Sequence, residues 1–185
     1  MTTVFLSGSR TIGRINNEVR FRLDNMIEND HAIVVGDANG ADKAMQAYLA
    51  EREYGDVTVY FVGDAPRNNV GGWPEKRVPA DEKLPGRNFY SQKDRYMSKL
   101  ADFGLVLWNG KSAGSVQNMI WLLSNGKKAV VYLSLRGRFC NLKTQDELIE
   151  MLSSFGEEVL DDIGKKIALP IQLQKSNRRQ ASMSF

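Results

Sequence analysis

Three short glycine-bearing segments contain the backbone and side-chain groups with which proteins bind anions. They span residues 8–10 (GSR), 36–42 (GDANGAD) and 110–115 (GKSAGS), and each follows an apolar run of strand type. Backbone N–H groups in such turns, and the positive end of a helix that begins there, favour a phosphate or a carboxylate. The alternative is that the small residues serve only sterics, with a serine capping the helix. The residues that we predict to bind phosphate or nucleotide here are Gly8, Ser9, Arg10, Gly36, Asp37, Gly40, Gly110, Ser112, Gly114 and Ser115.

Carboxylates are the groups left for acid–base chemistry near these segments. Asp37 and Asp42 lie in the second segment, and Asp94 and Asp102 lie further along the chain. Asp37 can bind a ribose hydroxyl or Mg²⁺, whereas Asp42, in a first helical turn, has the alternative role of complementing the helix dipole. Asp102 directly precedes a strand, where a cap or an ion pair is the alternative. We take Asp37 and Asp42 as the candidate catalytic residues.

The chain has one histidine, His31, and one cysteine, Cys140. We expect His31 in the turn before the second strand, away from the glycine-bearing segments, and Cys140 in a packing role. These counts argue against Ser-His-Asp and Cys-His catalysis and against a His/Cys metal site. A single cysteine forms no internal disulfide, which favours a reducing compartment. We predict no metal site and no cofactor, apart from Mg²⁺ that accompanies a bound phosphate.

Composition indicates a globular protein of one ordinary domain with an appendage. The chain has 185 residues, of which 42% are hydrophobic and 25% charged, and its formal net charge is +3. This small positive charge favours anionic partners only weakly. No apolar run approaches the roughly 18 residues of a membrane span. The first ten residues lack the pattern of a signal peptide, so we expect a cytoplasmic protein without a membrane partner.

Apolar runs at residues 4–7, 32–35, 57–62, 103–108 and 128–133 alternate with segments of helical periodicity. This alternation predicts an α/β protein, a Rossmann-like, doubly wound and mainly parallel sheet of five strands with added C-terminal helices. Ligands of such sheets bind beyond the carboxyl ends of the strands, where all three glycine-bearing segments would meet. We expect a nucleotide-binding domain over 1–135, a helical extension over 136–170, and a disordered basic tail over 171–185.

Residues 63–87 show no hydrophobic periodicity. A segment of this length without secondary structure is long for a connection within a compact domain. Trp73 in this segment is either part of a lid over an aromatic base or part of a mobile surface loop. Asn88 is expected to cap the helix that follows. Further along, Gly126 has the position of a left-handed helix stop, and residues 144–147 (TQDE) form a capping box.

In this order and spacing, the motifs resemble those of the SLOG superfamily, which includes the Lonely Guy phosphoribohydrolases and DprA. The resemblance covers residues 4–133 and is strongest to the YspA/YpsA-like branch. It is carried by GSR at 8–10, GDANGAD at 36–42, KDRYM at 93–97, Asp102 and WNGKSAGS at 108–115. It implies a Rossmann-like fold, a nucleotide-derived ligand and, by analogy with relatives that pair through helices near this edge, a homodimer.

Two positions depart from the Lonely Guy pattern. Lys93 stands where those enzymes carry an arginine, and Asn118 stands where they carry a glutamate needed to break the N-glycosidic bond. A carboxylate stabilises the oxocarbenium character that develops in that reaction, whereas an amide is neutral and only hydrogen-bonds. The departures therefore favour ligand binding over the inherited reaction, with Lys93 and Asn118 as further ligand-binding residues.

Three hypotheses remain open at this point. The first is a protein that binds or senses a nucleotide or nucleotide-derived small molecule. The second is a hydrolase of N-glycosidic bonds in a nucleoside phosphate or an NAD-like compound, in which Asp37 or Asp42 replaces the missing acid. The third, which the diffuse basic residues do not favour, is a DprA-like binder of single-stranded nucleic acid that uses the 63–87 segment and residues 175–179.

Overall fold

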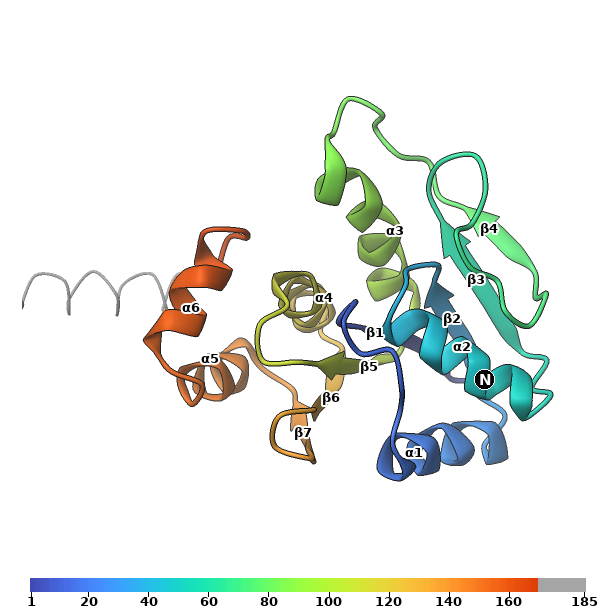
Figure 1. Ribbon diagram of the computed structural model, residues 1–185, viewed down its shortest axis with the longest axis horizontal. Helices are drawn as coiled ribbons and strands as arrows, with labels where there is room; N and C mark the ends of the chain where they lie inside the picture. The colour runs from blue at the N-terminus through green and yellow to red at the C-terminus, as the bar shows by residue number, and fades with distance from the viewer. Residues whose placement is uncertain (170–185) are drawn as a thin grey trace, which may run out of the picture.

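The computed structural model describes residues 1–169, which form a seven-stranded sheet flanked by six helices (Figure 1). The sheet has the order β4-β3-β2-β1-β5-β6-β7, and all neighbouring strands are parallel except β6 and β7. The strands are β1 (Thr3–Gly8), β2 (Ala32–Gly36), β3 (Val57–Phe61), β4 (Glu75–Arg77), β5 (Phe103–Trp108), β6 (Lys128–Leu133) and β7 (Arg138–Leu142).

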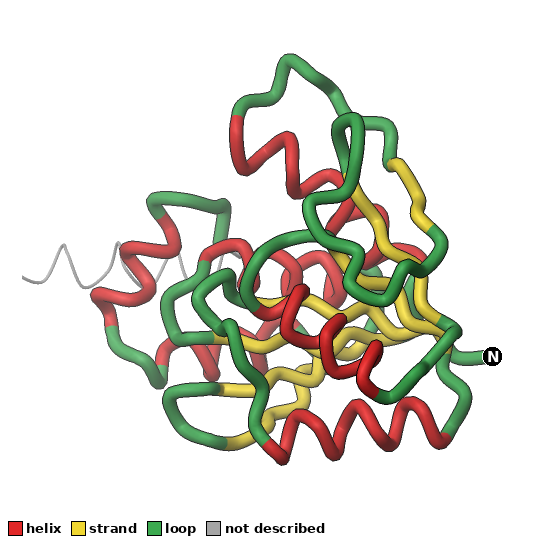
Figure 2. Tube along the Cα trace, turned by 45° about the vertical axis from the view of Figure 1, so that its right-hand side comes forward, coloured by secondary structure: helices red, strands yellow, loops and turns green. Residues whose placement is uncertain are grey.

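The helices cover both faces of the sheet (Figures 1 and 2). One face is packed by α1 (Asn17–Glu28) and α2 (Ala41–Glu51). The other is packed by α3 (Gly86–Leu100), α4 (Ala113–Ser124) and α5 (Gln145–Ser153), and α6 (Glu157–Gly164) packs against α5. This doubly wound arrangement confirms the predicted Rossmann-like α/β fold.

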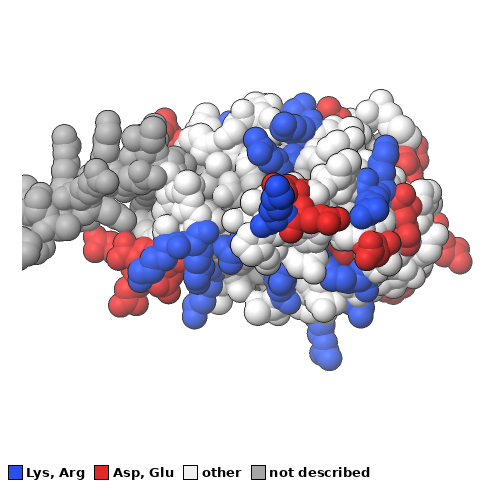
Figure 3. All heavy atoms as spheres, turned by 90° about the horizontal axis from the view of Figure 1, so that it is seen from above, with Lys and Arg blue, Asp and Glu red and all other residues white. Residues whose placement is uncertain are grey.

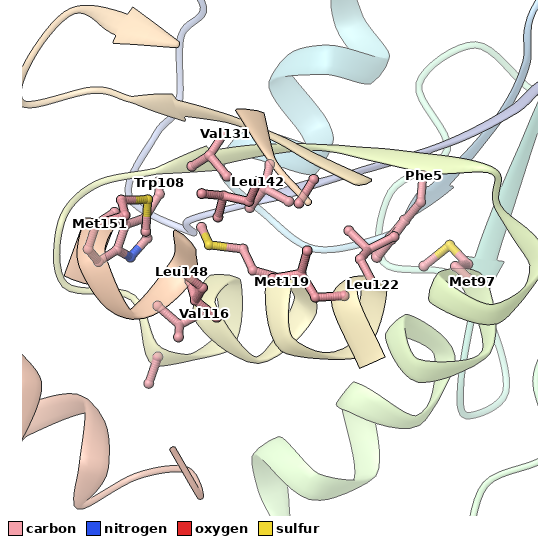
Figure 4. Close-up of a cluster of buried hydrophobic side chains, with 14 of the residues drawn as sticks. Phe5, Met97, Trp108, Val116, Met119, Leu122, Val131, Leu142, Leu148 and Met151 are labelled. Carbon is pink, nitrogen blue, oxygen red and sulfur yellow. The ribbon is translucent and has the colours of Figure 1, made fainter. Parts of the chain in front are cut away.

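The core lies in two layers because successive side chains of a strand point to opposite faces. In β1, Val4 and Leu6 join the cluster under α1 and α2, whereas Phe5 joins the cluster on the other face. Figure 4 shows that α4 directs Met119 and Leu122 into this second cluster. The central strands β1 and β5 pair in parallel over most of their lengths. This pairing fixes the relative positions of the loops that follow the two strands.

The expected strand positions are confirmed, but the number of strands is seven rather than five. The missed strands are β4 and β7, both at sheet edges. All three residues of β4 are exposed, so its sequence carries no buried face for a pattern to reveal. In β7 only Leu142 is buried. Edge strands of this kind lack the hydrophobic alternation on which sequence prediction depends.

The segment between β3 and α3 is more ordered in its contacts than the sequence suggests. Trp73 is buried in the hydrophobic cluster on the α1 and α2 face of the sheet, and its Nε1–H donates to the carbonyl of Tyr54 at 2.8 Å. The burial of Trp73 fits neither alternative drawn from the sequence, a lid over a bound base or a surface loop. The prediction that Asn88 caps the next helix is wrong, because α3 begins at Gly86 after Pro85.

Two predicted helix ends are confirmed. Gly126 has a φ of +71° just after α4, and Thr144 and Glu147 form the capping box of α5. The predicted basic tail over 171–185 lies outside the residues that the structure describes. Within residues 1–169, no helix is long and apolar enough to cross a membrane.

Candidate functional site

A cavity of about 600 Å³ lies beyond the carboxyl ends of β1 and β5. These neighbouring strands lead to helices on opposite faces of the sheet, β1 to α1 and β5 to α4. Such a switch point leaves a crevice between the two connections, which is where ligands of open α/β sheets bind. The two loops and the N-terminal turn of α4 form one wall, and the first part of α3 forms another.

The loop after β5 is fixed in the shape that begins α4. The Asn109 side-chain oxygen accepts hydrogen bonds from the backbone N–H groups of Lys111 and Ser112. The Ser112 hydroxyl accepts one from the N–H of Ser115 and so caps the helix. Other N–H groups in the first turn lack acceptors within the helix and carry its positive dipole end. Because Ser112, Gly114 and Ser115 line the cavity, this helix end faces it.

Ser9 and Gly40 hold the loops together instead of lining the cavity. Ser9 is fully buried, and its hydroxyl lies 3.1 Å from the Asn109 side-chain oxygen and 3.2 Å from the Ser115 hydroxyl. Gly40 has a φ of +86°, and a Cβ there would come within 2.2 Å of the Arg10 backbone. Contacts between the loops therefore explain why a serine and a glycine stand at these positions. Arg10, unlike Ser9 and Gly40, lines the cavity.

Two buried polar side chains offer unused hydrogen-bonding capacity to the cavity. Ser7, at the end of β1, is 3% exposed, and its hydroxyl has no hydrogen-bond partner within residues 1–169. Asn118, on α4, is 5% exposed and likewise makes no side-chain hydrogen bond within that range. Buried polar groups of native proteins are nearly always paired, with protein, water or ligand. Ser7 and Asn118 thus mark the cavity as a place where a polar ligand is expected.

A buried lysine lies at the inner end of the cavity among three carboxylates. The Lys93 ammonium is 2.6 Å from an Asp94 oxygen and 3.7 Å from an Asp37 oxygen, and its side chain is 3% exposed. Burial alone would lower the pKa of Lys93, but the charges of Asp94 and Asp42 raise it above its ordinary value. Lys93 is therefore a permanent cation in the cavity wall.

Asp37 is bound by an arginine that the sequence did not single out. Arg67, in the segment after β3, donates from Nε and Nη2 to the two carboxylate oxygens at 2.8 and 2.6 Å. Burial alone would raise the pKa of Asp37, but the hydrogen bonds from Arg67 hold it below its ordinary value. Asp37 does not line the cavity. In this structure Asp37 instead forms an ion pair with Arg67, and its catalytic and ligand-binding roles stay predictions.

Asp42 has the opposite environment and does line the cavity. Its carboxyl is 5% exposed and accepts one hydrogen bond, from the N–H of Ala38 at 3.3 Å. Burial raises the pKa of Asp42 to about 7, although Lys93 acts to lower it. With Asp37 paired to Arg67, and Asp94 to Lys93, Asp42 is the carboxyl without a cation of its own. It is a weak acid that exchanges a proton near neutral pH.

Gly36 makes room for this pair of groups. A Cβ at Gly36 would lie 2.6 Å from an Asp42 oxygen and 2.8 Å from the Lys93 ammonium nitrogen. Both distances are too short for a side chain to fit without moving them. Gly36 therefore shapes the inner end of the cavity without lining it.

The structure brings most of the predicted residues to one cavity. Those in its lining are Gly8, Arg10, Asp42, Lys93, Ser112, Gly114, Ser115 and Asn118. Those outside the lining are Ser9, Gly36, Asp37, Gly40 and Gly110. Gly110 has a φ of +79° and packs near Leu135, so it serves the turn. Among residues 1–169, no group of three or more His, Cys, Asp or Glu side chains could hold a metal ion.

Several lining residues are not among the predicted site residues, although some of them lie within the predicted segments. They are Ser7, Thr11, Ala38, residues 86–88, Tyr90, Ser91, Asp94, Asn109, Lys111, Ala113, Gln117, Trp121, Lys166 and Ile167. Ser7 directly precedes the segment 8–10, so an extension of that motif by one position would have found it. Asp94 lies within the motif at 93–97 and is among the carboxylates available for acid–base chemistry, but it is not a predicted site residue. Lys166 and Ile167 follow α6, and only the three-dimensional fold reveals that they reach this cavity.

Comparisons with known proteins support the fold. No family model and no curated protein sequence matches the chain. Among solved structures, the chain is similar to DNA processing protein A from Helicobacter pylori, described for its single-stranded DNA binding mode. The two share 16% sequence identity over 89% of this chain and 79% of the other, with a TM-score of 0.55. At this identity the likeness establishes a shared α/β architecture.

Proposed function

We propose that the protein binds a nucleotide or nucleotide-derived small molecule in the cavity between the β1 and β5 loops. The proposal depends most on the buried Ser7 hydroxyl, which has no hydrogen-bond partner within residues 1–169 and lies in the same cavity lining as Asn118 and the N-terminus of α4. The helix end and Arg10 suit a phosphate, because N–H groups and a guanidinium donate to its oxygens. Asn118, Asp42 and Asp94 suit the hydroxyl and amide groups of a sugar or a base.

The same observations support a place in the SLOG superfamily, with the YspA-like branch as the nearest by motif. The motif residues Gly8, Arg10, Lys93 and Ser115 all reach the cavity lining. The fold likeness to DNA processing protein A is compatible with that placement.

Isothermal titration calorimetry of the full chain against AMP, ADP-ribose, NAD and cyclic nucleotides tests the proposal. We expect saturable binding of at least one compound, weakened by Ser7→Ala and by Asn118→Ala. Ser98→Ala is the matched control, because Ser98 is also fully buried but donates to the Arg95 carbonyl at 2.8 Å and does not line the cavity. Folded protein that binds none of these compounds would contradict the proposal.

Hydrolysis of an N-glycosidic bond is a second candidate function, favoured by Asp42. In this reaction the C1′–N bond breaks, and its electrons and the Asp42 proton pass to the leaving base. Water then supplies hydroxide to C1′ and returns a proton to the carboxylate. A carboxyl with a pKa near 7 is partly protonated at neutral pH and can still release its proton, as general acid catalysis requires. Chromatography of nucleotides incubated with the protein should then show released base, lost in Asp42→Asn; intact nucleotides after incubation with a binding-competent protein would refute it.

Binding of single-stranded nucleic acid is a third candidate, favoured by the likeness to DNA processing protein A. The face seen in Figure 3 carries basic and acidic side chains interspersed, without a continuous basic surface. Phosphate-backbone binding requires clustered cations and weakens steeply with salt. Gel-shift titrations of single-stranded DNA at several salt concentrations distinguish this candidate, which predicts a steep salt dependence. Weak binding that does not change with salt would argue against it.

A further inference from the structure

Four exposed cations surround the cavity and come from four different segments. Arg10 follows β1, Arg87 lies in the first turn of α3, Lys111 precedes α4, and Lys166 follows α6. None of the four forms an ion pair with a residue in the range 1–169. The cavity lining therefore carries more positive than negative charge, because Asp42 and Asp94 are the only carboxylates that residues 1–169 contribute to it.

Lys166 owes its position to the core contacts of α6. The backbone N–H groups of Lys166 and Ile167 both donate to the carbonyl of Ile163, whose side chain is fully buried. Leu169 is also buried in the cluster that α3, α4 and α5 share. The neighbouring Lys165 does not line the cavity, and its ammonium lies 3.4 Å from an Asp162 oxygen. Two adjacent lysines thus have different surroundings, and one of them faces the cavity.

One phosphoryl group does not account for this amount of positive charge. A phosphate monoester carries about −1.5 to −2 at pH 7. The α4 N-terminus, Arg10 and Lys111 all line the cavity and suffice to bind it. Arg87 and Lys166 lie on other segments and remain for a second anionic group. Arginine binds phosphate oxygens in pairs, and lysine binds them as a point charge, so both types suit a further phosphoryl group.

We propose that Arg87 and Lys166 bind a second phosphoryl group, which makes the site selective for nucleoside diphosphates or other nucleotides that contain a diphosphate. This inference rests on the proposed function, because the first phosphoryl group is placed at the N-terminus of α4. The buried Ser7 hydroxyl, which has no hydrogen-bond partner within residues 1–169, independently indicates that a polar ligand binds in this cavity. The C-terminal extension is then part of the binding site.

Calorimetric titrations of the full chain with AMP and ADP, GMP and GDP, CMP and CDP, and UMP and UDP test the inference. For at least one base we expect the diphosphate to bind about tenfold more tightly than the monophosphate, as one added charge-assisted contact would produce. Arg87→Ala and Lys166→Ala should each remove most of this gain and leave monophosphate affinity within about twofold. Lys165→Ala should change neither affinity, and thermal unfolding should show that all variants are folded.

The outcomes separate the two proposals. If monophosphates bind and diphosphates bind no more tightly, the second phosphoryl site is refuted and the proposed function stands. A Lys166→Ala variant that weakens both classes equally would also refute the second site. If a folded protein binds none of the eight nucleotides and none of ADP-ribose, NAD and cyclic nucleotides, both proposals fail.

Discussion

Replacing Ser7 by alanine should separate stability from binding in this protein. The Ser7 side chain is 3% exposed, and its hydroxyl is without a hydrogen-bond partner in residues 1–169. A buried polar group left unpaired costs about 1–3 kcal/mol. Alanine removes that group with almost no change in volume, so we expect the free energy of unfolding to rise by about 1 kcal/mol.

Ser98→Ala provides the comparison. Ser98 is fully buried as well, but its hydroxyl donates to the Arg95 carbonyl at 2.8 Å. Loss of a satisfied hydrogen bond costs about 1 kcal/mol, so Ser98→Ala should lower the free energy of unfolding. Because Ser7→Ala should raise it, the two variants should differ in unfolding free energy by about 2 kcal/mol. Urea unfolding, with equal m-values in all three proteins, measures the difference.

Ser7→Ala should also weaken the binding of nucleotide. A hydroxyl kept in an unfavourable environment is useful where a ligand pairs with it, so the stabilised variant should bind nucleotide more weakly, by about three- to tenfold. If Ser7→Ala loses as much stability as Ser98→Ala, the hydroxyl is already satisfied and the argument fails. If it gains stability and binds nucleotide as before, the hydroxyl does not contact the ligand.

Three further predictions concern the inner end of the cavity. Asp42→Asn should remove a fall in unfolding free energy between about pH 4 and 7, because a pKa of about 7 rather than 3.8 means that the folded state binds the proton more tightly. Urea unfolding at pH 5 and 8 checks this, and an unchanged pH dependence would contradict it. Gly36→Ala should cost about 1–3 kcal/mol and weaken binding, since its Cβ would lie 2.6 Å from the Asp42 carboxylate; Gly55→Ala, with open space around it, is the control. Arg67→Ala should cost about 3 kcal/mol by leaving the buried Asp37 without its bidentate partner, and denaturation that shows no loss would refute that role.

Sequence patterns predicted the central part of this fold because buried parallel strands have continuous apolar runs. The strands at 103–108 and 128–133 have the predicted bounds, and the predicted small-residue loops follow β1, β2 and β5. The strand β4 could not be predicted in this way, because its three exposed residues pair only through their backbones. The burial of Trp73 was also not predictable, because the residues next to a loop tryptophan do not show whether its side chain is buried or exposed.

Site residues that directly follow a strand could be predicted from the sequence. Those placed by contacts between distant parts of the chain could not. Gly8, Arg10 and Ser115 reach the cavity as their motifs suggested. The pairing of Asp37 with Arg67 joins residues 30 positions apart, and the sequence gives no sign of it. Lys166 lies still further away, and its place at the cavity depends on how α6 packs.

The central claim is that a phosphate lies where the N-terminus of α4 meets the loop after β1. A crystal structure of the protein with the mononucleotide that binds most tightly tests it directly. We predict phosphate oxygens within hydrogen-bond distance of the first-turn N–H groups of α4 and of Arg10, with Ser7 and Asn118 paired to the ligand. A nucleotide bound elsewhere on the molecule, or bound here with its phosphate away from α4, would contradict the claim.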